Sequence, residues 1–128
     1  MRDLASNISV SMSLIPATQS ATAKGTAVDL LGFDSAALVI TTGAIVSSGL
    51  YVMSLQESAT TTDGDFTDVA ASNVVGTLPT SLAASSSYKV SYVGTKRYVR
   101  AVITKTSGTS IDAGAAFILG HATQRPVA

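Results

Sequence analysis

The residues that could support catalysis are few and lie far apart in the sequence. The chain of 128 residues has no cysteine, which excludes thiol nucleophiles, zinc–thiolate sites and disulfides. Its one histidine, His121, follows a glycine at the expected end of the last strand, and no nucleophile-elbow sequence is present. We therefore interpret His121 as a partly exposed structural residue. We expect a protein that is not an enzyme, and a hydrolase is the least favoured function.

Three acidic residues, Asp63, Asp65 and Asp68, form the one cluster that suggests a metal site. A calcium-binding EF-hand needs a twelve-residue loop that ends in glutamate, and this segment has neither feature. A solvated hairpin tip explains the cluster better, because Asp63 followed by Gly64 supplies the positive φ angles of a tight turn. No glycine-rich phosphate loop is present. We expect no metal and no cofactor.

The basic residues Lys96, Arg97 and Arg100 flank Tyr98. Proteins that bind nucleic acid usually carry a basic excess, whereas here eight basic residues balance eight acidic ones. A strand face with salt bridges, or a contact with an acidic patch on a partner, fits better than a nucleic-acid site. Strand alternation places Tyr98 and Arg100 on the same face, with Arg97 opposite. Both residue types are favoured at interface centres, so Tyr98 and Arg100 are candidate partner-binding residues.

The overall composition is that of a weakly charged surface. Charged residues make up 12% of the chain, against roughly 25% in an average soluble domain, and the formal net charge is zero. Such a surface is poorly protected against association. We favour a surface that is covered in an assembly over a small domain kept soluble by serine and threonine. We recognise no secretory signal, and the most apolar stretch, residues 36–46, is far shorter than the roughly 20 residues that span a bilayer. No membrane partner is expected.

The hydrophobic pattern has the period of two that is typical of β-strands. About eight short runs separated by turn signals predict an all-β fold, an antiparallel β-sandwich resembling a jelly roll, over residues 26–128. Residues 36–42 are nearly continuously apolar and are expected to be buried on both faces, with a loop at 43–49. The expected core residues are Leu38, Ile40, Val52, Leu55, Val90, Val99, Ile103, Phe117 and Leu119.

Residues 1–25 differ from the rest and predict an extended N-terminal arm. Its apolar residues alternate with serines and are expected to share one face. Such an arm has little to bury alone, so we expect it to add to a sheet edge, either its own or a neighbour's. A disordered tail is the alternative. The candidate partner-binding residues in the arm are Ile8, Val10, Met12 and Leu14.

Several short segments carry a family resemblance, which runs from about Gly25 to His121. They are residues 25–30, 32–36, 55–58, 66–69 and 92–100. Together they resemble small virion proteins of tailed bacteriophages, which are commonly encoded near the major capsid gene. The resemblance implies a head decoration, or cement, protein with a jelly-roll-like sandwich, placed outside the head where it ties capsomers together. It implies no catalytic residue. The arm and residues 43–49 match no pattern of the family.

We therefore expect a structural virion protein on the capsid exterior, made in the cytoplasm of a host bacterium. The expected partners are the major capsid protein and further copies of the chain itself, as a dimer or trimer. The alternative is another virion role, in the tail, the head–tail connector or a fibre. A carbohydrate-binding module is less favoured, because aromatic residues are only 5% and tryptophan is absent. Copy number in the particle would separate the virion roles.

Overall fold

The computed structural model of the protein describes residues 3–122. The first two residues of the expected arm and the expected tail at 124–128 lie outside this range. Within it, the three short 3-10 helices are far from long or apolar enough to cross a membrane. The elements are η1 (Ala5–Asn7), β1 (Ser9–Gln19), β2 (Ala23–Lys24), β3 (Val28–Asp29), β4 (Phe33–Val46), β5 (Leu50–Ser58), η2 (Asp63–Asp65), β6 (Thr67–Asp68), η3 (Ala71–Asn73), β7 (Val74–Val75), β8 (Ser87–Tyr92), β9 (Tyr98–Ser107) and β10 (Ser110–Ala122).

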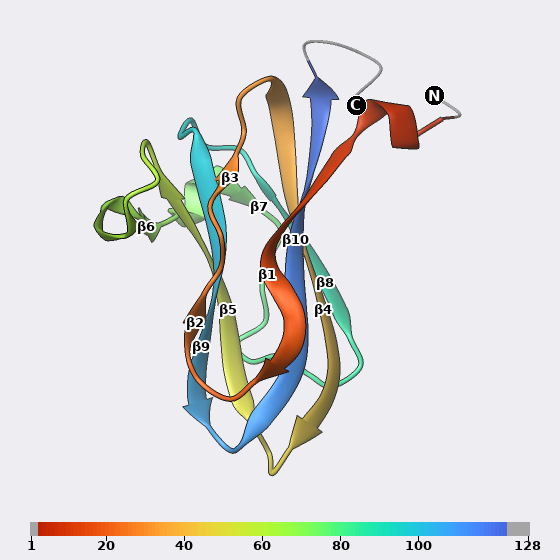
Figure 1. The fold of residues 1–128 in the computed structure, drawn as a ribbon, viewed down its shortest axis with the longest axis vertical. Helices are drawn as coiled ribbons and strands as arrows, with labels where there is room; N and C mark the ends of the chain where they lie inside the picture. The colour runs from red at the N-terminus through yellow and green to blue at the C-terminus, as the bar shows by residue number, and fades with distance from the viewer. Residues whose placement is uncertain (1–2, 123–128) are drawn as a thin grey trace.

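The strands form two antiparallel sheets that face each other, which confirms the predicted all-β sandwich (Figure 1). Sheet A has the order β1-β10-β4-β8-β7, and sheet B has the order β2-β9-β5-β6, with β3 also paired to β9. When the two-residue strands β3 and β7 are set aside, the first strand pairs with the last and the second with the next to last. This is the strand order of a jelly roll, in which two Greek keys wrap around one core.

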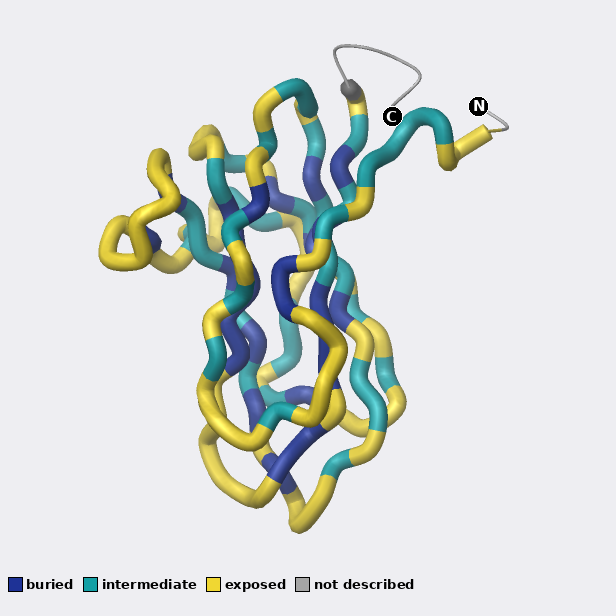
Figure 2. Tube along the Cα trace, viewed as in Figure 1, coloured by how far each residue is buried: buried dark blue, intermediate teal, exposed yellow. Residues whose placement is uncertain are grey.

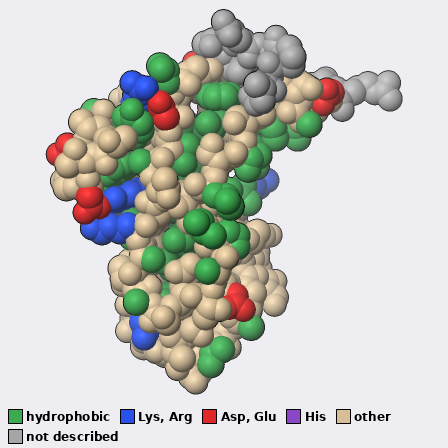
Figure 3. All heavy atoms as spheres, viewed as in Figure 1, with side chains coloured by type: hydrophobic (Ala, Val, Ile, Leu, Met, Phe, Trp, Pro, Cys, Tyr) green, Lys and Arg blue, Asp and Glu red, His purple; other side chains and the backbone are tan. Residues whose placement is uncertain are grey.

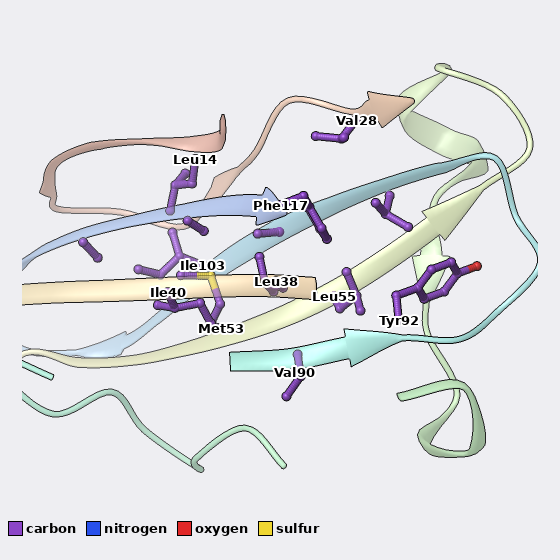
Figure 4. Close-up of a cluster of buried hydrophobic side chains, with 14 of the residues drawn as sticks. Leu14, Val28, Leu38, Ile40, Met53, Leu55, Val90, Tyr92, Ile103 and Phe117 are labelled. Carbon is purple, nitrogen blue, oxygen red and sulfur yellow. The ribbon is translucent and has the colours of Figure 1, made fainter. Parts of the chain in front are cut away.

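The core lies between the two sheets and is built from the alternate residues of each long strand (Figures 2 and 4). Eight of the nine expected core residues are buried, and Leu38, Ile40 and Phe117 are completely inaccessible to solvent. The prediction for Val52 was wrong, because β5 turns Tyr51, Met53 and Leu55 inward and leaves Val52 half-buried on the outside. Period two allows only one of these two sets to reach the core.

Strand β4 corrects two further expectations. Its residues 36–42 are buried on one face only, because Ala37 and Val39 on the other face are half-exposed. The loop predicted for 43–49 is also shorter than expected, since β4 continues to Val46, which pairs with Ser110 of β10. The turn itself is made by Ser47 and Ser48, both with positive φ, and by Gly49.

The predicted tight turn at Asp63 and Gly64 is instead part of a longer connection. Residues Asp63–Asp65 form the 3-10 helix η2, and Gly64 is not among the residues with positive φ. The strands β5 and β6 do pair as a hairpin, but eight residues separate Ser58 from Thr67, too many for a two-residue turn.

The segment expected to form the arm supplies β1, which adds to the edge of the chain's own sheet A alongside β10. The expectation that its apolar residues share one face was wrong. The register shifts between Met12 and Leu14, and this irregularity turns Leu14 into the core, while Val10 and Met12 stay 62% and 57% exposed. An extra residue in one strand reverses the alternation of the residues that follow it.

Ser13 sits at that irregularity and joins the two sheets. Its Oγ accepts a hydrogen bond from the Ala101 N–H at 2.9 Å and donates one to the Thr26 carbonyl at 2.8 Å. The Ser13 carbonyl accepts the Thr26 N–H at 2.5 Å. Gly25 lies against this group, and a Cβ there would collide with the Ser13 side chain and with the Ala101 carbonyl. Close approach of the chain segments therefore requires glycine at this position.

We predict that Ser13→Ala lowers the free energy of unfolding by about 1–3 kcal/mol, because it leaves the buried Ala101 N–H without an acceptor. Urea denaturation measures this change. The matched control is Ser11→Ala, two residues earlier on the same strand and half-buried, which should change stability by less than about 0.5 kcal/mol. Equal effects of the two substitutions would contradict the role given to Ser13.

Candidate interaction surface

The outer face of sheet A carries apolar side chains in rows that cross its strands. The pairing register places Val10 beside Ile118, Ile118 beside Ala37, and Ala37 beside Ser91, which pairs with Val75. The neighbouring row runs through Met12, Ala116, Val39 and Lys89. We call this set the sheet A face.

The sheet A face is exposed and almost uncharged. Val10, Met12 and Val75 are each more than half exposed, and the other apolar members are half-buried. Strand alternation directs only two charged residues of the sheet A strands to this side: Lys89, which lies beside Val39, and Asp112, which lies near the start of β10. A contiguous apolar patch of this kind on a monomer is typical of a surface that binds another macromolecule.

The outer face of sheet B has the opposite character. Arg100 is 6% exposed: its Nη1 contacts Asp63 at 2.6 Å, its Nε bonds Gln56, and its guanidinium lies 4.1 Å above the Phe66 ring. The Asp63 Oδ2 also forms an ion pair with the Lys24 Nζ, at 3.1 Å. On the side of the molecule drawn in Figure 3, most charged side chains gather over sheet B, and hydrophobic ones run down the middle.

These bonds account for the charged residues singled out in the sequence. Arg97 forms two hydrogen bonds to Asp29, and Arg100 bonds Asp63, so both guanidinium groups are paired with carboxylates of the chain itself. The two Arg97 bonds hold the pKa of Asp29 below its usual value, and Arg100 and then Lys24 do the same for Asp63. The guanidinium of Arg100 is bonded within the chain, whereas Tyr98 is half-buried at the surface beneath Arg97.

The acidic cluster is divided among different partners. Asp63 bonds Lys24 and Arg100, Asp65 accepts the Thr60 hydroxyl, and Asp68 accepts the Gln56 amide. Within residues 3–122 no group of three or more acidic or histidine side chains is arranged to hold a metal ion.

His121 is exposed and lies at the end of β10, where its Nδ1 is 2.5 Å from the Ser35 Oγ. A serine–histidine nucleophile also needs a group that orients the ring, and within residues 3–122 no carboxylate bonds His121. With Ile8 and Ile118, the pair instead lines a shallow hollow of about 340 Å³ at one end of the sheet A face.

A larger groove of about 770 Å³ lies between the β3–β4 turn and the β8–β9 loop. The Tyr92 hydroxyl at its wall donates to Glu57 Oε1 at 2.6 Å and accepts the Lys96 N–H at 3.0 Å. Burial, followed by the bond to Glu57, raises the pKa of Tyr92 to about 12. The bond joins β8 of sheet A to β5 of sheet B, so the polar groups of this wall stabilise the fold.

The six candidate partner residues thus lie in different places. Val10 and Met12 belong to the sheet A face, and Ile8 borders it. Leu14 is in the core, and Tyr98 and Arg100 are on the opposite sheet. The sequence interpretation missed the rest of the face. It expected the strand at residues 36–42 to be buried on both sides, and it did not distinguish an outer face on the last strand. The sequence did carry a signal for this face. In residues 36–39 and 115–119, both the inward and the outward positions of the strand hold apolar residues.

Comparisons with known proteins bear on the fold. No protein-family model and no curated protein sequence matches the chain. The crystal structure of the SPBc2 prophage-derived protein YomS is similar, with a TM-score of 0.52 and 11% identity over 88% of this chain and 93% of that chain. A looser likeness, with a TM-score of 0.44 and 14% identity, covers 93% of this chain but only 33% of a chain in the structure of the infectious bursal disease virus Gx strain. At 11% identity, the likeness to YomS establishes the shared fold alone.

The raised pKa of Tyr92 predicts how stability depends on alkaline pH. The neutral phenol is favoured in the folded state, so its contribution is complete below pH 10 and is lost as pH rises through about 12. We expect Tyr92→Phe to lower stability at pH 8 by about 0.5–1.5 kcal/mol and to lose less between pH 10 and 12 than the wild type. Urea midpoints across this range measure both effects, and parallel pH profiles would contradict the assignment.

Proposed function

We propose that this protein is a structural component of a phage virion that binds the outside of the head and stabilises it by bridging subunits of the major capsid protein. The observation that carries the proposal is the sheet A face. It is apolar and nearly uncharged, and it lies on the side of the sandwich opposite the ion pairs. A protein that acts by being covered in an assembly needs such a face and needs no catalytic group.

Two further observations support this function. The segments at 25–30, 32–36 and 92–100 resemble small phage head proteins, and all three contribute residues to the groove that Tyr92 lines. The low charge of the whole chain permits close packing of many copies on a lattice. Each contact need not be strong, because attachment at two or more points raises the effective affinity by about 10²–10⁴.

The expected energetic effect of a charge on this face is large. An aspartate placed where a shell subunit packs is removed from water without a partner, which opposes binding. Ile118 is suited to such a test, because it is a half-buried residue of the sheet A face whose neighbours on the adjacent strands, Val10 and Ala37, are uncharged. Val52 is its natural control, because it is a half-buried outward valine at the corresponding place on sheet B.

We predict that shells carrying the wild-type protein withstand higher temperature than bare shells, and that Ile118→Asp reduces binding to assembled capsid protein at least tenfold. Val52→Asp should bind as the wild type does. Co-sedimentation measures binding, and calorimetry of the particles measures shell stability. Circular dichroism first checks that both variants retain the β-sheet fold.

Two results would overturn parts of this proposal. Equal stability of bare and decorated shells, with no binding to assembled capsid protein, would exclude the cement function and favour the connector, tail or fibre alternative. Loss of binding in Val52→Asp but not in Ile118→Asp would assign the contact to sheet B instead.

A further inference from the structure

Strand β1 is the one long edge strand within residues 3–122. The other strands that end a sheet, β7 in sheet A and β2 and β6 in sheet B, have two residues each. Very short edge strands are one of the ways in which β-proteins avoid pairing with other chains. With eleven residues, β1 departs from this pattern (Figure 1).

The open part of the β1 edge is its first four residues. From Ser13 onward the strand is bonded to Thr26 and Ala101 of sheet B, and its register shifts again between Leu14 and Ala17. Before that point the strand is regular, and residues 9–12 pair in register with 119–116 of β10. The open edge is therefore about 13 Å long, at roughly 3.3 Å per residue.

This edge lacks the usual side-chain protection against pairing. Residues 4–19 contain no charged side chain, and the proline at position 16 lies beyond the open part. Val10 and Met12 stand on the outer face of the edge and are each more than half exposed. A lysine or a proline at such a position is what normally prevents strand addition.

We propose that the open edge of β1 pairs antiparallel with the same edge of a second copy, across a twofold axis perpendicular to sheet A. The pairing joins the two A sheets into one ten-stranded sheet. Twofold symmetry places a surface against an identical surface, so any charge on it would face a like charge. The open edge carries no charged side chain and the chain has zero net charge, so this repulsion does not arise.

Side-chain alternation restricts the register of this pairing. Residues that face each other must lie on the same side of the sheet, so the axis passes between the two copies of one residue, either Val10 or Ser11. With the axis at Val10, the two copies of Val10 lie side by side on the outer face. With the axis at Ser11, Val10 of each copy lies beside Met12 of its partner on that face. The two sheet A faces then form one continuous apolar surface. Each face can bind a shell subunit, and the pairing fixes their relative orientation.

The absence of native cysteine allows a direct test on the protein alone. Single cysteines placed in turn at positions 9, 10, 11 and 12 should give an oxidised dimer at position 10 or at position 11, according to the axis, and much less at its neighbours. Thr61→Cys, in an exposed loop on the far sheet, is the control and should not cross-link.

A charge variant gives a second, independent readout. Val10→Lys places like charges together at the axis and should raise the dimer dissociation constant at least tenfold in analytical ultracentrifugation. Ile15→Lys is the matched control, since Ile15 is 66% exposed on the same strand but lies beyond the open part, and it should remain dimeric.

The outcomes separate this proposal from the proposed function. A wild type that stays monomeric over the whole concentration series, with no position-specific cross-link, overturns the dimer and leaves shell binding to be judged by Ile118→Asp. Loss of shell binding in Val10→Lys without any dimer in solution also overturns it, and assigns the edge to a strand of the shell. A dimer that binds no shell supports this pairing and contradicts the function proposed above.

Discussion

The sandwich depends on how its first strand, a member of sheet A, is joined to sheet B, and a single serine makes this connection. Ser13 satisfies a backbone donor of β9 and a carbonyl next to β3 while its own strand pairs with β10. A buried backbone group without a partner is costly, so these three segments are held in one arrangement. The resulting irregularity sends Leu14 into the core and leaves Val10 and Met12 outside.

The sequence predicted the class of fold and most of the core, because period two is visible in a single strand. It did not predict the faces of β1, since a shift of one residue is caused by the distant segments that bond Ser13. The sheet A face was missed for a related reason. In a nearly continuous apolar run such as 36–42, Ala37 and Val39 have the composition of interior residues. They lie outside because no further layer of the described residues covers that side of sheet A. Arg100 was placed on the correct strand face, but the 59–66 connection that covers it was not foreseeable from local pattern.

The two outer faces divide the chemistry of the molecule. Ion pairs on sheet B hold a loop that folds back over the sheet. One of them joins the almost buried guanidinium of Arg100 to Asp63. The sheet A face has no such covering segment in the described residues, and its side chains other than Lys89 are small or apolar. A charged residue in this position would favour solvent, whereas valine, methionine and isoleucine favour contact. The same sandwich therefore has one face completed by its own chain and another available to a partner.

The pairing of the first strand with the last also has a kinetic consequence. Sheet A has β10 between β1 and β4, so β1 has no partner strand, and β4 has only β8, until β10 has been synthesised. Folds dominated by such distant pairings form slowly, and they expose unpaired strands while they do so. Because β10 fixes β1 in place, the edge of β1 is created in the final step. In the pairing proposed above, association of copies through that edge would then wait until each chain has completed its own core.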